Sequence, residues 1–191
     1  MIKGCRIHSG KKVGILVENN GGGTIEGCEI INNALAGIQI MYASNPTIRT
    51  CHVEHGKNVG ILIDENGAGT IDDCDIFANA YYGLEIRRGS NATISNCRIT
   101  HGQKYGLLFV ENSGGRVEGC TITNNAHGGV AIFQGSNPEL LKCKVKRNQY
   151  FAITLQKASQ VVVENCDLRE NQKGAWYVDA DCHVTKSGTL E

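Results

Sequence analysis

Cysteine is the residue type in this chain whose chemistry most needs an explanation. Nine cysteines occur among 191 residues, and thiols can form disulfides, bind metal ions or act as redox groups. Zinc sites place cysteines in close pairs such as C-x2-C, and no such pair exists here. Eight of the nine instead follow one another at a constant spacing of 23 residues: Cys5, Cys28, Cys51, Cys74, Cys97, Cys120, Cys143 and Cys166.

A fixed spacing over most of a chain indicates a solenoid, in which equivalent residues of successive repeats stack in columns. Thiols in one column lie about one strand spacing apart, ~4.8 Å, which is farther than the ~3.5–4.5 Å between the Cβ atoms of a disulfide. They also cannot surround an ion tetrahedrally. We therefore expect eight buried, reduced thiols, no metal and no cofactor, with Cys182 in a loop as the one exposed thiol.

Paired carboxylates could perform acid–base chemistry on a polysaccharide. The best candidates are Asp72, Asp73 and Asp75, with Arg49 and Arg98 one repeat away on either side. The motifs N-T-D, G-H-G and D-P-H, which mark polygalacturonases and mannuronan epimerases, are absent. Charges in these columns mostly alternate in sign from repeat to repeat, which is typical of a solvated ladder of ion pairs. We therefore predict no catalytic residues.

The other chemistry-bearing residues give weaker signals. His55 and His101 share one column, and the spacing holds no nucleophile or carboxylate beside them. The run from Gly21 to Gly23 is not followed by a helix that could bind a phosphate. Basic and acidic residues both number 19, so we do not expect nucleic-acid binding. Apolar runs are only a few residues long, so we expect no membrane span.

Short strands must position these residues, because the apolar residues of each repeat alternate and are mostly β-branched. Each repeat reads T-I-x-x-C-x-I, then a turn, then G-I-x-I and a polar loop. Leucine is too scarce for leucine-rich repeats, and three strand-like segments fit into each repeat. The sequence therefore predicts an all-β fold, a single-stranded right-handed parallel β-helix of eight 23-residue coils.

One further column contains only glycine and asparagine: Gly10, Asn33, Gly56, Asn79, Gly102, Asn125, Asn148 and Asn171. These two residue types best tolerate a left-handed backbone. We therefore expect this column to adopt that conformation and to form a sharp corner in every coil.

The repeat also sets the expected domain boundaries. Residues 1–184 are predicted to form the eight coils, and residues 185–191 the start of a truncated ninth coil, where Lys186 occupies an apolar column. Leu190 and Glu191 resemble residues left by cloning. Natural solenoids need polar caps. Neither end shows one, so we expect a fragment of a longer protein that could self-associate through its uncapped ends.

The predicted outer face of the G-I-x-I strands is more apolar than a solvated sheet face needs to be. An apolar patch rimmed by charge is typical of a site for a partner. The alternatives are a strip covered by a loop, a neighbouring domain or a second copy of the chain. The predicted partner-binding residues are Leu16, Met41, Leu62, Glu85, Arg87, Leu108, Phe133 and Tyr177.

Three segments carry a resemblance to known proteins: Asn33–Ile38, Ser44–Arg49 and His55–Ile61. Together with the repeat, they resemble the pectin-lyase-like β-helix superfamily and its "carbohydrate-binding and sugar hydrolysis" (CASH) repeats. Within that superfamily they are similar to the β-helix of F-box-only ubiquitin-ligase receptors. That similarity implies a protein partner, which could be a degron.

These observations favour a non-catalytic scaffold that recognises a protein partner, such as the substrate-receptor domain of a ubiquitin ligase. The alternative is a carbohydrate-binding or polysaccharide-degrading β-helix of lyase, hydrolase or epimerase type. A glycan groove prefers exposed aromatic platforms, yet the chain has only 1 Trp and 6 Tyr, and Trp176 lies in an inward column. Free thiols persist in a reducing compartment, so the expected location is intracellular, in the cytoplasm or nucleus.

Overall fold

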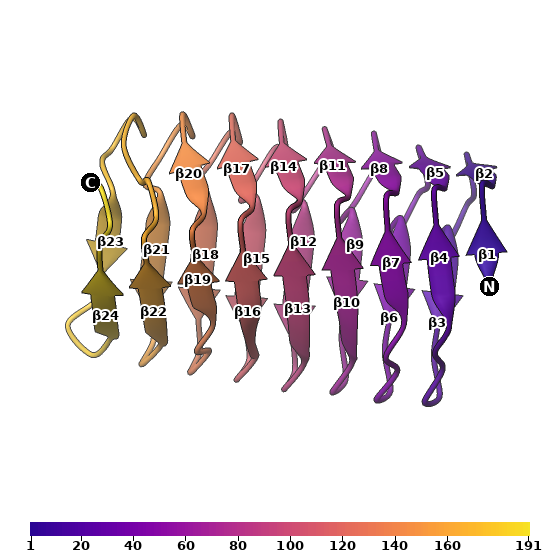
Figure 1. Ribbon diagram of the computed structural model, residues 1–191, viewed down its shortest axis with the longest axis horizontal. Helices are drawn as coiled ribbons and strands as arrows, with labels where there is room; N and C mark the ends of the chain where they lie inside the picture. Colours follow the sequence, from indigo (N-terminus) through magenta and orange to yellow (C-terminus); the bar gives the residue numbers. More distant parts are fainter.

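A computed structural model of the chain describes residues 1–191, which form strands and turns without any helix. The strands build three long parallel sheets, with the N-terminus at one end of the molecule and the C-terminus at the other (Figure 1). This arrangement confirms the predicted parallel β-helix. The molecule has no helix that could cross a membrane.

Successive coils add strands to the three sheets in turn. Sheet A contains β1 (Ile2–Lys3), β4 (Thr24–Glu26), β7 (Thr47–Arg49), β10 (Ala68–Asp72), β13 (Asn91–Ser95), β16 (Gly114–Glu118), β19 (Glu139–Leu141), β22 (Gln160–Glu164) and β24 (His183–Ser187). Sheet B contains β2 (Arg6–His8), β5 (Glu29–Ile31), β8 (His52–Glu54), β11 (Asp75–Phe77), β14 (Arg98–Thr100), β17 (Thr121–Thr123) and β20 (Lys144–Lys146). Sheet C contains β3 (Ile15–Val17), β6 (Ile38–Ile40), β9 (Ile61–Ile63), β12 (Leu84–Arg87), β15 (Leu107–Val110), β18 (Val130–Phe133), β21 (Ile153–Gln156) and β23 (Trp176–Val178).

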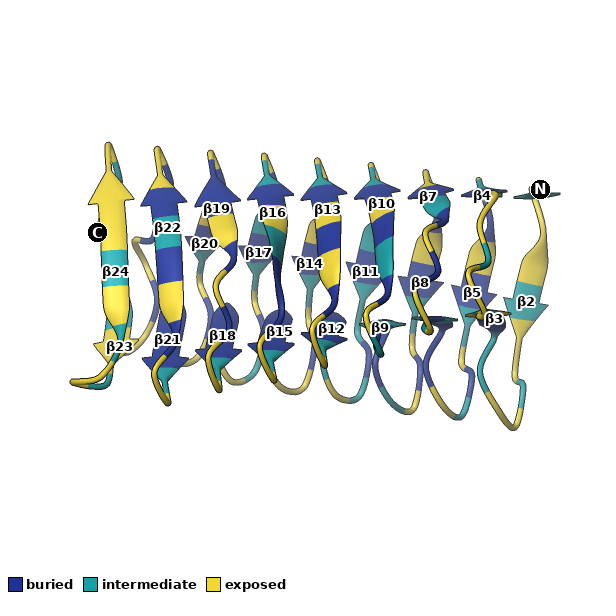
Figure 2. Ribbon diagram, turned by 90° about the horizontal axis from the view of Figure 1, so that it is seen from below, coloured by how far each residue is buried: buried dark blue, intermediate teal, exposed yellow.

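Neighbouring strands pair residues that lie one repeat apart in the sequence. In sheet A, for example, Ile71 lies between Ile48 and Ile94. Because side chains alternate along a strand, this register keeps each apolar column on one face of its sheet. The buried faces of the three sheets meet inside the solenoid, where 37 buried hydrophobic residues form a single core (Figure 2).

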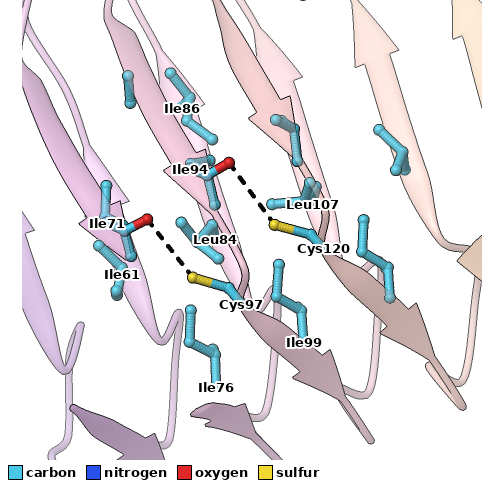
Figure 3. Close-up of a cluster of buried hydrophobic side chains, with 14 of the residues drawn as sticks. Ile61, Ile71, Ile76, Leu84, Ile86, Ile94, Cys97, Ile99, Leu107 and Cys120 are labelled. Carbon is cyan, nitrogen blue, oxygen red and sulfur yellow. Dashed lines mark hydrogen bonds between the residues drawn. The ribbon is translucent and has the colours of Figure 1, made fainter. Parts of the chain in front are cut away.

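The cysteine column lies at the turn from sheet A to sheet B and points into this core. Seven of its eight thiols are at most 2% exposed, and the Cys97 thiol donates to the carbonyl oxygen of Ile71 across 3.6 Å (Figure 3). All nine cysteines are free, but Cys5 is exposed and Cys182 partly buried, so the prediction of eight buried thiols is wrong for Cys5. Cys5 lies in the first coil, where only one neighbouring coil covers it. Contact with the Cys120 thiol and burial raise the pKa of Cys97 to about 12, which keeps this thiol protonated at neutral pH.

The glycine and asparagine column does not adopt the left-handed conformation that the sequence predicts. The residues with positive φ are those directly before it, such as His101 with a φ of 60°. The asparagines instead bury their side chains and bind backbone groups of the preceding coil. Asn125 accepts a hydrogen bond from the backbone N–H of Gly102 at 3.0 Å and donates to the carbonyl oxygen of Ile99 at 3.3 Å. Side-chain packing and hydrogen bonding, rather than backbone conformation, therefore account for this column.

The stack of sheet A continues beyond residue 184. Strand β24 pairs with β22 along its full length, and Leu190 forms an isolated bridge with Asp167. The division of the chain at residue 184 stays a prediction.

Candidate functional site

The outward face of sheet C carries seven of the eight residues that the sequence analysis assigned to partner binding, and Met41 directly follows β6 at its edge. Leu16 and Tyr177 are exposed, Met41, Leu62, Glu85, Arg87 and Phe133 are half-buried, and Leu108 is buried. Leu108 is only 6% exposed although it points outward, in register between Glu85 and Ala131. The structure thus gathers these residues on one face, but Leu108 offers a ligand almost no surface.

A cavity of about 260 Å³ opens on this face over three consecutive coils. Its lining includes Gln39, Asn58, Leu62, Glu85 and Arg87. These residues come from β6, β9, β12 and the turn before β9. Amide and charged groups thus converge beside aliphatic surface, which is the composition of a site for a polar organic molecule.

The charged residues of this cavity hold one another in place. Arg87 Nη2 donates to Asp64 Oδ2 at 2.8 Å, and Asp64 is only 2% exposed. Arg87 Nη1 lies 3.4 Å from Glu85 Oε1, while the buried Nε of Arg87 has no hydrogen-bond partner. Burial raises the pKa of Glu85, and Arg87 only partly opposes this effect. Glu85 therefore keeps its proton at a higher pH than an exposed glutamate does.

A row of six aromatic rings lies beyond the cavity, four of them on the turns before the strands of sheet C and two on the strands themselves. We call Tyr105, His127, Phe133, Tyr150, Phe151 and Tyr177 the aromatic strip. The centroids of neighbouring rings are 4.7–6.2 Å apart, and the rings of His127 and Tyr150 are stacked. Tyr150 and Tyr177 remain 39% and 43% exposed, so the strip presents ring surface to solvent.

The sequence analysis missed this strip because it counted aromatic residues over the whole chain instead of by column. Two adjacent columns in the turn before sheet C hold Tyr81, Tyr82, Tyr105, His127, Tyr150 and Phe151. With Tyr177 on sheet C itself, five of the six tyrosines lie in this region, and only Tyr42 lies elsewhere. Sorting the tyrosines by repeat position would have revealed this concentration.

The structure brings the carboxylates considered for catalysis together only in part: Asp73 and Asp75 line one cavity with Arg98, whereas Asp72 lies on sheet A. Asp72 ends β10 in sheet A, whereas Asp75 begins β11 in sheet B and pairs with Arg98. Arg49 pairs instead with Glu26 at 2.8 Å. The turn between the two sheets therefore separates Asp72 from Asp75. No group of three or more His, Cys, Asp or Glu side chains is placed to hold a metal ion.

A sequence model of the right-handed β-helix region matches residues 1–70 and 51–189, which together cover nearly the whole chain. The chain belongs to the right-handed β-helix family. This membership establishes the hand of the coil that the sequence predicted. A search of curated proteins finds no match to this β-helix.

Three solved structures share the fold of this β-helix. The periplasmic alginate epimerase AlgG matches it with a TM-score of 0.81 and 16% identity, over 93% of this chain and 47% of that chain. Pectate lyase Pel9A matches with a TM-score of 0.72 and 15% identity, over 94% of this chain and 55% of that chain. The A-module of the mannuronan C-5 epimerase AlgE6 from Azotobacter vinelandii matches with a TM-score of 0.59 and 17% identity, over 98% of this chain and 56% of that chain. This β-helix therefore spans about half of each, and such identities show a shared fold alone.

These comparisons correct two expectations from the sequence. The non-catalytic scaffold for protein recognition is contradicted, because the three structures above are polysaccharide-acting epimerases and a lyase. The similarity to F-box receptors finds no support in the family model or in these structures. The intracellular location is contradicted because one of these proteins is periplasmic. The thiol argument failed for a physical reason. Burial and column geometry keep the ladder cysteines unpaired, so their free state says nothing about the compartment.

Proposed function

We propose that this β-helix binds an extended polysaccharide along the outer face of sheet C, outside the cytoplasm. The aromatic strip is the observation that carries the proposal. Exposed rings in a row offer flat apolar surfaces on which the C–H faces of sugar rings can stack while the hydroxyl groups stay in water. The alginate epimerase and the pectate lyase that share the fold support the same class of ligand.

The spacing of the coils suits a chain of sugar units. Successive coils advance by about 4.8 Å, which is close to the advance of one sugar ring in an extended glycan. Four consecutive coils, from Tyr105 to Tyr177, each place at least one ring in the strip. A glycan that runs parallel to the solenoid axis would therefore meet a ring at nearly every sugar.

The cavity at the other end of this face would take the polar groups of further sugar units. Its Gln39 and Asn58 amides can donate to and accept from hydroxyl groups, and Arg87 is held in place by buried Asp64. Burial raises the pKa of Glu85, so its carboxyl group holds a proton to a higher pH than an exposed glutamate does. A carboxyl group of this kind is what acid–base processing of a bound glycan needs. Processing at Glu85 is therefore the second candidate function.

Calorimetric titration with alginate, polygalacturonate and β-glucan oligosaccharides tests the binding. We expect at least one of them to bind, and Tyr150→Ala to weaken its affinity about tenfold because stacking area is lost. Tyr42→Ala is the matched control, because Tyr42 is 49% exposed and lies outside the strip. The proposal fails if none of these glycans binds, or if both variants weaken binding equally. Chain-length and NMR analysis of the same glycans tests processing, which Glu85→Gln should abolish without loss of binding.

A further inference from the structure

The outer face of sheet B carries a second cleft that the proposed function does not use. Its volume is about 480 Å³, larger than that of the cavity on sheet C. Three adjacent strands, β8, β11 and β14, provide its lining, which includes His52, Glu54, Asp75, Phe77, Arg98 and Thr100. The volume falls within the range of small-molecule sites, which is about 300–1,000 Å³.

Phe77 provides the apolar surface of this cleft. It lies in register between Glu54 and Thr100 and is half-buried. The rings of His55 and His101 lie on either side of it, with centroids 5.4 and 5.0 Å from the centroid of Phe77. No other strand of sheet B contains a Phe, Tyr or Trp. The ring is therefore an isolated platform that its neighbours hold in place.

Polar groups in fixed orientations surround this platform. Arg98 donates two hydrogen bonds to the carboxylate of Asp75, and His52 Nδ1 lies 3.4 Å from the same carboxylate. The hydrogen bonds from Arg98 lower the pKa of Asp75, so Asp75 stays ionised. The one ionic neighbour of Glu54 is His55, whose Nδ1 lies 3.8 Å from Glu54 Oε2. Two carboxylates, Glu54 and Asp75, thus face one guanidinium, Arg98, and these three groups together carry a net negative charge.

We propose that the sheet B cleft binds one uncharged sugar unit, separately from the glycan on sheet C. A single aromatic ring bordered by planar carboxylate and guanidinium groups provides a stacking surface and paired donors and acceptors for adjacent hydroxyls. Because Asp75 and Arg98 already orient each other, little ordering is required when a sugar binds. The net negative charge disfavours a uronate, since a further carboxylate would be repelled by Glu54 and Asp75.

Amide NMR titration of the labelled protein with cellotetraose, laminaritetraose, mannotetraose and tetragalacturonate tests this site. We expect at least one neutral tetrasaccharide to shift the amides of β8, β11 and β14, and tetragalacturonate to shift them at least tenfold more weakly. Phe77→Leu keeps apolar area but removes the ring. It should weaken binding of the neutral tetrasaccharide about tenfold. Glu54→Gln should reduce the discrimination against tetragalacturonate.

Tyr150→Ala separates this proposal from the proposed function, because it removes a ring of the aromatic strip and leaves sheet B unchanged. It should leave the shifts in β8, β11 and β14 intact even if binding to sheet C is lost. The second site is refuted if no neutral tetrasaccharide shifts these amides, if Phe77→Leu binds as tightly as the wild type, or if tetragalacturonate binds the cleft equally well. None of these results would affect the aromatic strip, whose own amides report on sheet C.

Discussion

Inward positions of this solenoid keep nearly one residue type from coil to coil, whereas outward positions vary, although both belong to the same repeat. In sheet A the inward positions Ile48, Ile71 and Ile94 keep one residue type over three coils. Their outward neighbours change from Arg49 to Asp72 and then to a serine. A column that keeps one residue type is therefore explained by packing in the core. Functional residues are best sought in the outward columns, where the residue type changes from coil to coil.

Volume explains why the inside tolerates so little change. A buried side chain lies against its equivalents in the coils above and below, at the packing density of a crystal. A change of one methylene group is therefore felt by two neighbours at once. An outward side chain meets water, and its identity is free to follow a ligand. The six-ring aromatic strip and the Phe77 cleft both lie in columns that vary from coil to coil.

The largest expected effect compares two adjacent residues of β9. Ile61 is fully buried and Leu62 is half-buried on the outer face. Ile61→Ser should cost more than the ~2–5 kcal/mol of an Ile→Ala change, because it adds an unpaired hydroxyl to the core. Leu62→Ser should cost less than about 1 kcal/mol. Urea denaturation of both variants measures the difference.

Leu108→Ser provides a third point for this comparison, because Leu108 is intermediate between the two β9 residues. Leu108 points outward like Leu62, yet it is only 6% exposed, so its cost should fall between those of the two β9 variants. Equal costs for Ile61→Ser and Leu62→Ser would show that the assignment of inward and outward residues is wrong.

A smaller effect is expected in the buried asparagine column. Asn125→Ala removes the acceptor of the Gly102 N–H and the donor to the Ile99 carbonyl oxygen. Leaving buried groups of this kind unpaired should cost about 1–3 kcal/mol. Asn91→Ala is the control, because Asn91 is exposed at the start of β13. If both variants unfold at the same urea concentration, the buried hydrogen bonds do not explain why asparagine recurs in this column.

The sequence was sufficient to predict the parts of the molecule that packing dictates. The 23-residue spacing, the alternation of apolar residues and the scarcity of leucine led to the parallel β-helix and its three strands per coil. The corner was misplaced by one residue. The left-handed backbone falls at positions such as Ala78 and Arg147, whose residue types give no indication of it. There the hydrogen bonds between coils impose the conformation against the local preference.

The candidate sites were harder to predict because they depend on contacts between different columns. Phe133 and Tyr105 are 28 positions apart, yet their ring centroids are 6.2 Å apart, a relation that a single column does not show. The sequence did place Glu85 and Arg87 on one outer face. It did not show that Arg87 is held by buried Asp64. It also grouped Asp72 with Asp75, although a turn directs them to different sheets.

The smallest expected effect is a difference in how stability depends on pH. It compares an acidic residue on each outer face, Glu85 on sheet C and Asp75 on sheet B. Burial raises the pKa of Glu85 on sheet C, so the folded protein holds this proton more tightly than the unfolded chain does. Glu85 therefore favours folding at low pH, and this contribution is lost as the pH rises through its folded pKa. Arg98 lowers the pKa of Asp75 on sheet B. Asp75 therefore stabilises the fold above its unfolded pKa, and this contribution is lost as the pH falls through its folded pKa.

Urea denaturation between about pH 3 and pH 7 should show opposite trends for the two acids. The stability of the wild type relative to Glu85→Gln should fall as the pH rises, whereas its stability relative to Asp75→Asn should rise. The second change should stay below about 1 kcal/mol, because Arg98 is largely exposed to solvent. If the stability of the wild type relative to Glu85→Gln does not fall as the pH rises, the carboxyl in the sheet C cavity is solvated like an ordinary surface acid. Glu85 would then no longer be distinguished by a raised pKa on the face where we propose that the glycan binds.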